Sequence, residues 1–296
     1  MAAIIFLLAL AYVVPAYFAV RAMTAMDRVP LSSSPADHGL AFESVAFPSR
    51  DGITLRGWWI DGGGPQTVIM AHGKGSVRDD AGLMYLELAA GLARAGHDVL
   101  LFDLRGHGES DFGRFTIGVN EPRDVLGAVD FARARGVPVD KIALLGFSTG
   151  AVAALEAAVQ EPGVGAVIAD GAWPDLRELL DREMATESPL PSFYNPGIYL
   201  VARLVFGWDV SEQVAIDDVT EIVGSGRPVF VIHGSGDQYT SVEQAARFAA
   251  AIRDSPNAEF WQITGAEHVS GYASYPDEYL ARLLAFLSRT IGKTVP

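Results

Sequence analysis

The sequence reads KIALLGFSTGAVAALE over residues 141–156. Residues 141–145 form an apolar run typical of a buried strand, and residues 151–156 favour a helix. Ser148 stands between them, flanked by Gly146 and Gly150, which lack the Cβ atoms that would collide with neighbouring backbone in a sharp turn. Such a turn strains the serine backbone and exposes its hydroxyl. The stretch therefore predicts a strand, a tight turn that carries a nucleophile, and a helix.

Strand and helix patterns alternate along the rest of the chain. The expected strands cover residues 43–48, 53–60, 66–71, 98–103, 141–145, 166–170, 228–232 and 258–263. The expected helices cover residues 79–95, 122–135, 151–160, 242–252 and 277–288. Most of these strands are apolar throughout, which is typical of a parallel sheet with helices on both faces. The first two strands flank Asp51-Gly52, a hairpin signal, so we expect an antiparallel edge.

The length and composition suit one large α/β domain. The chain has 296 residues, of which 50% are hydrophobic, enough to bury a sizeable core. We assign residues 43–170 and 228–296 to this core. Residues 171–227 lack an expected strand and contain four prolines, which indicates an insertion. Because it follows the carboxyl end of a strand, we expect a helical lid over the site; the alternative is extra helices that pack to one side for stability.

A base and a carboxylate that could activate Ser148 each follow a later strand. Asp237 comes just after the strand 228–232, and His268 comes just after the strand 258–263. A serine hydroxyl needs a base to take its proton, and a carboxylate to hold that base in the right tautomer. The order Ser, Asp, His is the order of the triad in α/β hydrolases. Taken singly, Asp237 also fits a turn aspartate and His268 a surface histidine, and Ser148 fits a helix-capping serine.

Acyl transfer also needs hydrogen-bond donors for the oxygen that becomes negative. The backbone N–H of Thr149 starts the helix after Ser148, where the helix dipole supports an anion. The backbone N–H of Lys74, which follows His72-Gly73 after a central strand, is the second expected donor. We expect the Lys74 ammonium to point to solvent; the alternative is that it attracts an anionic group of the substrate.

Other chemistries find little support in the sequence. His107 lies too early in the chain to be the base of this triad, and Glu267 is the alternative carboxylate beside His268. We find no metal-binding spacing and no dinucleotide fingerprint, so we expect neither a metal nor a cofactor. The net charge of −14 disfavours nucleic-acid binding. Zero cysteines exclude disulfides and a cysteine nucleophile.

The N-terminal segment has a different character. Ala2 to Val20 carries no charge and is long enough, at about 1.5 Å per residue, to cross most of a bilayer. We interpret residues 1–28 as a membrane anchor with its flank and residues 29–42 as a linker, so the anchor should be separable from the core. Arg21 and Arg28 after the span favour a cytoplasmic catalytic domain. The alternative is a signal peptide cleaved after Ala22, which leads to secretion.

These motifs resemble the α/β-hydrolase superfamily from about Glu43 to the end of the chain. The resemblance rests on the His72-Gly73 turn, the loop DLRGHGES at 103–110, the elbow at 146–150, and the two later triad residues. The opening hairpin and the N-terminal anchor are similar to the Bem46-like and prolyl-oligopeptidase-like branches. The resemblance implies an α/β-hydrolase fold with a central, mostly parallel sheet. Serine at position 148 departs from the branches that use aspartate or cysteine there.

The sequence as a whole indicates a serine hydrolase of carboxylic esters or thioesters. Ser148 would attack, His268 would shuttle the proton, and Asp237 would orient the imidazole. The substrate pocket is expected from apolar residues of the lid, which alternatively form the core of the lid itself: Phe193, Tyr194, Tyr199, Leu200 and Trp208. Two other functions stay open, a peptidase or amidase with the same triad and an idle binding protein on this fold.

Overall fold

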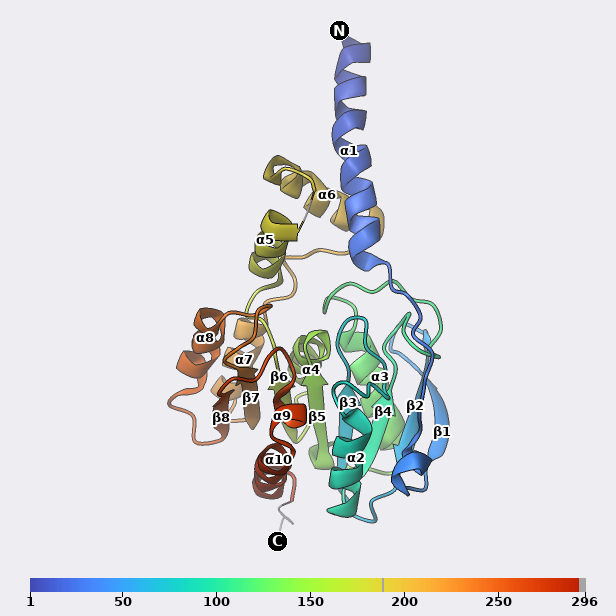
Figure 1. Ribbon diagram of the computed structural model, residues 1–296, viewed down its shortest axis with the longest axis vertical. Coiled ribbons are helices and arrows are strands. Elements are labelled where there is room, and N and C mark those ends of the chain that lie inside the picture. Colours follow the sequence, from blue (N-terminus) through green and yellow to red (C-terminus); the bar gives the residue numbers. More distant parts are fainter. Residues whose placement is uncertain (188, 293–296) are drawn as a thin grey trace.

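The structure, a computed structural model, describes residues 1–187 and 189–292. Its centre is one sheet of eight strands in the order β1-β2-β4-β3-β5-β6-β7-β8 (Figure 1). β2 runs antiparallel to β1 and to β4, and the remaining neighbours are parallel. The strands span Glu43–Pro48, Thr54–Ile60, Thr67–Ala71, Asp98–Phe102, Ile142–Phe147, Ala166–Asp170, Val229–Gly234 and Ala258–Ile263. This is the α/β-hydrolase fold, and the predicted fold class is confirmed.

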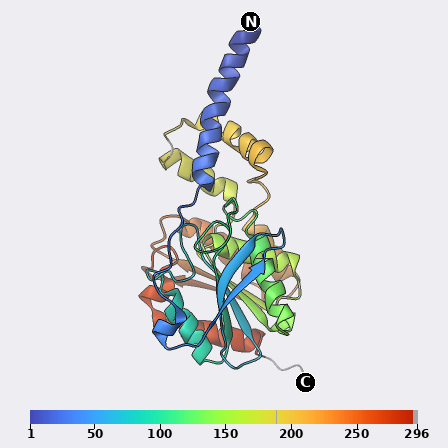
Figure 2. The ribbon, with the colours of Figure 1, turned by 90° about the vertical axis from the view of Figure 1, so that its right-hand side faces the viewer.

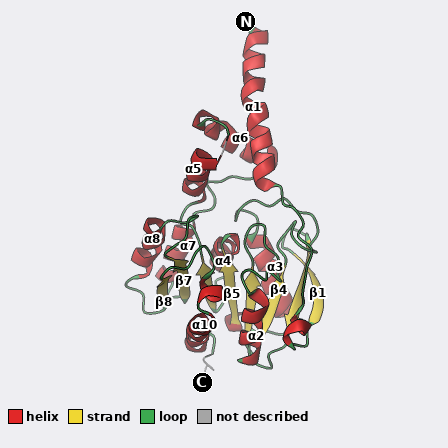
Figure 3. Ribbon diagram, in the orientation of Figure 1, coloured by secondary structure: helices red, strands yellow, loops and turns green. Residues whose placement is uncertain are grey.

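Helices cover both faces of the sheet, as the apolar strands require (Figures 2 and 3). One face packs against α3 (Pro122–Ala134), α4 (Thr149–Gln160) and α7 (Ala215–Gly224). The other packs against α2 (Tyr85–Arg94) and α10 (Pro276–Thr290). Of two further helices, α8 (Val242–Ile252) connects β7 to β8, and α9 (Gly271–Ser274) lies between β8 and α10. Each helix turns its apolar side to the sheet, which gives two separate buried cores.

The helix expected over residues 79–95 is shorter than predicted, because it begins only at Tyr85. The carboxylate of Asp79 accepts a hydrogen bond from the backbone N–H of Ser32 at 2.6 Å. The carboxylate of Asp80 accepts one from the backbone N–H three residues later at 3.1 Å. Short polar side chains that bind nearby backbone in this way compete with helix formation. The bond to Asp79 also ties the expected linker to the core.

The expected insertion divides into two structurally different parts. Its last helix, α7, packs against α4 and α8 and buries Ala215, Val219 and Ile222 along one side. Its earlier helices, α5 (Leu176–Glu187) and α6 (Asn195–Phe206), stand beyond the carboxyl ends of the strands (Figure 1). Only this earlier part therefore lies apart from the sheet and its covering helices.

The N-terminal helix α1 (Ala2–Thr24) lies beside α6 and projects away from the sheet (Figures 1 and 2). The Tyr12 hydroxyl donates a hydrogen bond to the carbonyl of Phe193 at 2.8 Å and accepts one from the N–H of Gly197 at 3.1 Å. A Cβ at Gly197 would lie only 2.4 Å from the Tyr12 ring, so the absence of a side chain permits this approach. The helix is thus attached to the rest of the protein near its midpoint.

Candidate active site

Ser148 occupies the turn between β5, which ends at Phe147, and α4, which begins at Thr149. Its backbone has φ 54° and ψ −118°, a region that L-residues rarely adopt. A Cβ at Gly146 would lie 2.1 Å from the carbonyl oxygen of Gly150. A Cβ at Gly150 would lie 2.1 Å from the carbonyl oxygen of Ala71 at the end of β3. Gly146 is therefore required by the turn itself, and Gly150 by the close approach of the neighbouring strand.

The three residues of the predicted triad come together at the carboxyl edge of the sheet. His268 Nε2 lies 2.8 Å from Ser148 Oγ, and His268 Nδ1 lies 2.7 Å from Asp237 Oδ2. The carboxylate therefore accepts a hydrogen bond from Nδ1–H, which keeps the proton on Nδ1 and leaves Nε2 free to accept the proton of the serine. The sequence separations are 120 residues from Ser148 to His268 and 31 from Asp237 to His268, so only the folded sheet brings them together.

The environment of Asp237 keeps its carboxylate charged. Burial raises the pKa of Asp237, but the hydrogen bond from His268 and the backbone N–H of Thr240 lower it, and the net pKa lies below its usual value. The other oxygen, Oδ1, accepts the N–H groups of Tyr239 at 2.8 Å and Thr240 at 2.9 Å. Both lone-pair sides of the carboxylate are thus occupied, which fixes the direction in which it holds the imidazole.

Gly171 is a further site residue, which the sequence reasoning missed. It follows β6 with φ 70°, and a Cβ there would lie 3.1 Å from Cε1 of His268. The aromatic ring of Tyr239 lies 5.0 Å from the imidazole by ring centroids. These two neighbours confine the His268 ring. The sequence signal for this site residue is a glycine directly after the strand that ends at Asp170.

The two expected oxyanion donors lie beside the nucleophile. Thr149 is the first residue of α4, so its N–H has no partner within the helix. Lys74 lines the same pocket as Ser148 and Thr149. Between them, a Cβ at Gly73 would lie 3.0 Å from Cβ of Ser148, so the loop after β3 reaches the serine only because residue 73 has no side chain.

Two buried histidines hold the loop that carries Lys74. His72 Nε2 accepts the N–H of Leu104 at 3.0 Å, and His107 Nε2 accepts the N–H of Gly75 at 3.2 Å. Both bonds need an unprotonated Nε2. Burial lowers the pKa of His72 to about 4 and the pKa of His107 to about 3, which keeps both rings neutral at pH 7. His107 is thus not the base but supports the oxyanion loop, a role that the sequence reasoning missed.

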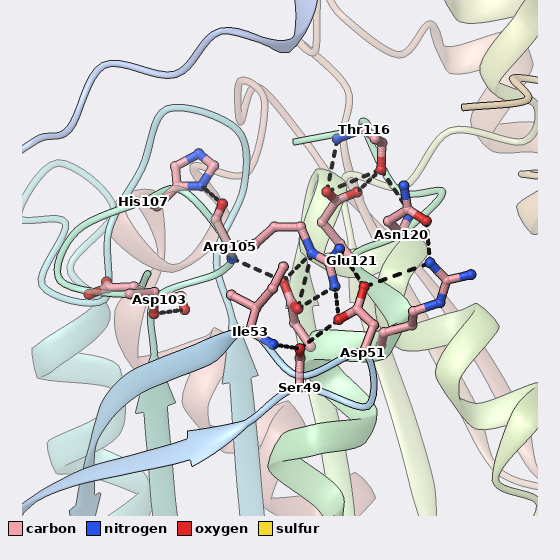
Figure 4. Close-up of polar contacts among 12 residues, drawn as sticks. Ser49, Asp51, Ile53, Asp103, Arg105, His107, Thr116, Asn120 and Glu121 are labelled. Atoms are coloured by element: carbon pink, nitrogen blue, oxygen red, sulfur yellow. Dashed lines mark hydrogen bonds and ion pairs between the residues drawn. The ribbon is translucent and has the colours of Figure 1, made fainter. Parts of the chain in front are cut away.

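The loop 103–110 that carries His107 is fixed in turn by buried ion pairs (Figure 4). The guanidinium of Arg105 lies 2.7 Å from Asp124 in α3 and 2.9 Å from Asp51 in the first hairpin. The carbonyl of Arg105 lies 3.0 Å from Nδ1 of His107. The ion pairs therefore join the hairpin and α3 to the loop 103–110 through the side chain of Arg105.

Ser148, His268 and Lys74 face a pocket of about 630 Å³. Lids usually supply the outer walls of such pockets, and α5 contributes Leu179 and Glu183 here. The chain directly after α1 contributes as well, through Ala25, Met26, Asp27 and Val29. These four residues lie between the expected anchor and the expected core, and they form part of the wall of the active-site pocket.

None of the five residues expected to bind substrate lines this pocket: Phe193, Tyr194, Tyr199, Leu200 and Trp208. Trp208 is fully buried in the core. Phe193 and Tyr194 stack against Tyr12 of α1 with ring centroids 6.2 and 5.2 Å away. The two residues on α6 also lie outside the pocket. Phe193 and Tyr194 thus attach α6 to α1. The apolar character of these residues does not by itself reveal that they contact α1.

Within residues 1–187 and 189–292, no group of three or more His, Cys, Asp or Glu side chains has an arrangement that could hold a metal ion.

Comparison with known proteins agrees with this fold. A family profile described as the alpha/beta hydrolase fold matches residues 66–191. The uncharacterized protein YqkD of Bacillus subtilis is 29% identical over 261 residues, which cover 85% of this chain and 82% of YqkD. The uncharacterized protein YfhR of Salmonella typhimurium is 25% identical over 271 residues, covering 84% and 82% of the two chains.

Among solved structures, the esterase Pf2001 of Pyrococcus furiosus is similar with a TM-score of 0.75 and 28% identity. The similarity covers 90% of this chain and 98% of that esterase. The alpha/beta hydrolase GrgF from Penicillium has a TM-score of 0.66 at 22% identity, which supports the fold alone.

Proposed function

The chain belongs to the α/β-hydrolase superfamily, and we propose that it is a serine hydrolase that cleaves carboxylic esters or thioesters through an acyl-enzyme. The observation that carries the proposal is the continuous hydrogen-bonded line from Ser148 through His268 to Asp237. Similarity to an esterase over nearly the whole chain supports ester substrates.

In the first half-reaction, Ser148 Oγ attacks the carbonyl carbon while His268 Nε2 takes the hydroxyl proton. The carbonyl oxygen becomes negative between the N–H groups of Lys74 and Thr149, where fixed dipoles stabilise it. As the carbonyl re-forms, the bond to the leaving oxygen or sulfur breaks, and His268 gives its proton to the leaving group. An alcohol or thiol departs and the acyl group stays on Ser148.

In the second half-reaction, water replaces the leaving group. His268 takes a proton from the water, whose oxygen attacks the acyl carbon, and the oxyanion forms again between the same two N–H groups. The bond to Ser148 Oγ then breaks, and His268 returns the proton to the serine. The carboxylic acid leaves and the enzyme is restored without any cofactor.

We also propose that α1 is retained as a single membrane anchor, with the catalytic domain on the cytoplasmic side. Among the described residues α1 is long and apolar enough to cross a membrane, which is the property that an anchor and a signal sequence share. Its first half exposes Phe6 and Leu8, at 65% and 66%. Its second half buries Ala16 and Val20 against the protein, and a signal peptide cleaved after Ala22 would remove that contact.

We further propose that α5 and α6 form the lid over the active site. Leu179 and Glu183 of α5 line the Ser148 pocket, and α6 packs on α1 above it. A lid in this place excludes water from the acyl-enzyme and supplies apolar contacts to the substrate.

The proposal is tested with the full-length protein in detergent micelles. We expect hydrolysis of p-nitrophenyl butyrate by the wild type and none above background by Ser148→Ala. Ser270→Ala removes the half-buried hydroxyl of a serine near His268 that lies outside the triad, and it is the matched control. Faster cleavage of peptide anilides than of esters would favour a peptidase. Equal rates for the wild type and Ser148→Ala would favour an idle binding protein.

A further inference from the structure

A second cavity, of about 480 Å³, lies between α1 and the helices α5 and α6. Its α1 wall includes Phe18, Ala19 and Met23, and its opposite wall includes Leu180 of α5 and Ile198 of α6. Apart from Lys74 and Glu183, every residue that lines it is apolar. Its volume is within the range of small-molecule sites, roughly 300–1,000 Å³.

The cavity adjoins the catalytic pocket. Lys74 and Glu183 line both spaces, so the apolar cavity begins where the polar reaction site ends. Lys74 also carries one of the two N–H groups assigned to the oxyanion. A substrate whose carbonyl lies at Ser148 can therefore direct an apolar chain past Lys74 into the second cavity.

The outer end of the cavity reaches the most apolar surface of the molecule. Phe18 lines the cavity and is also 58% exposed. Beyond it, α1 exposes its apolar first half, and the neighbouring α6 exposes Leu200, Leu204 and Val205 at 56, 72 and 58%. Such a patch is larger than isolated surface residues explain, and it surrounds the point where α1 leaves the protein.

We propose that this cavity is an acyl-binding site whose one wall is the anchor helix itself, and that the substrate is a long-chain lipid ester taken from the bilayer. The proposal rests on the proposed function and specifies its substrate class. The lipid chain lies between α1 and α5–α6, its carbonyl reaches Ser148, and its far end leads back toward the membrane. The helix α1 thus serves as part of the binding site as well as an anchor.

The experiment measures kcat/KM for p-nitrophenyl esters from two to sixteen acyl carbons, with full-length protein in one fixed detergent. For the wild type we expect a rise of roughly fourfold per methylene until the cavity is full. Ala19→Phe places a ring in the cavity and should lower the ratio of long-ester to short-ester kcat/KM by roughly tenfold or more. Ala9→Phe adds the same ring to an exposed part of α1 outside the cavity and should leave the profile unchanged.

Ala22→Trp is a second cavity variant that guards against misfolding of Ala19→Phe, because Ala22 lines the cavity but is exposed. If both cavity variants had the same dependence of kcat/KM on acyl chain length as Ala9→Phe, the acyl-site proposal would be overturned. Partitioning of the esters into micelles would then explain any chain-length effect. In that case short-ester hydrolysis that depends on Ser148 would still support the proposed function. If the wild type showed no hydrolysis that depends on Ser148, both the acyl-site proposal and the proposed function would be overturned.

Discussion

Gly197 of α6 places its backbone N–H 3.1 Å from the hydroxyl of Tyr12 in α1, across 185 residues of sequence. Helices approach this closely only where one of them lacks a side chain. The contact joins the helix that could cross a membrane to the helix that stands over the active site. The position of α1 is therefore fixed by its contact with the folded domain.

Gly197→Val tests this attachment. The new Cβ would lie 2.4 Å from the Tyr12 ring, so α6 must move away from α1, at a cost of about 1–3 kcal/mol as for other overpacked sites. We expect faster limited proteolysis within α6 while the melting temperature of the core changes little. Gly224→Val, at a position with open space, is the control. Equal proteolysis of the two variants would mean that α6 does not rest on α1.

Asp237→Asn should keep the fold and lower kcat by about 10⁴, because asparagine holds the His268 imidazole in the wrong tautomer. Glu267→Gln should retain nearly normal activity, since the structure gives the Nδ1 contact to Asp237. Steady-state kinetics of both variants on the same ester decide. Normal activity of Asp237→Asn with loss in Glu267→Gln would reverse the assignment of the carboxylate.

His107→Leu should reduce kcat more than it changes KM. The variant removes the acceptor for the Gly75 N–H and loosens the loop that presents Lys74, so the expected loss approaches that of one oxyanion donor, about 10²–10³. His97→Leu, also at a buried histidine, is the control for general destabilisation. An equal loss of kcat in the two variants, or a change confined to KM, would show that His107 does not position the oxyanion loop.

The buried carboxyl of Asp170 makes stability depend on pH. Burial raises its pKa to about 7 despite the hydrogen bond from Tyr279, whereas in the unfolded chain it titrates near 3.8. Between these values the folded state holds a proton that the unfolded state has released. Stability from this group is therefore lost as pH rises from about 4 to about 7, by up to about 1.4 kcal/mol per unit, and changes little above pH 7.

Asp170→Asn isolates this contribution, because the lowered pKa values of buried His72 and His107 act in the opposite direction. We expect the variant to gain stability relative to the wild type steadily between about pH 4 and 7, measured by urea unfolding. A difference that stays constant across that range would contradict a shifted Asp170.

The local features of the site could be predicted from the sequence, because they depend on near neighbours. Gly146 is required by the backbone of a turn that involves five residues, and the triad follows from which residues succeed which strands. The helix expected from residue 79 failed where Asp79 binds the backbone of Ser32, a contact between distant segments. The five lid residues expected to bind substrate lie outside the Ser148 pocket for a similar reason, since the contact of Phe193 is with Tyr12, 181 residues away.

The central claim is that Ser148 is the nucleophile, and a fluorophosphonate probe tests it most directly. The serine oxygen would displace fluoride from phosphorus and keep the phosphonyl group. After digestion of the labelled full-length protein, mass spectrometry should find the adduct on the peptide that contains Ser148, with no labelling of Ser148→Ala and strongly slowed labelling of His268→Ala. An adduct on another residue, or none on the folded wild type, would contradict the account.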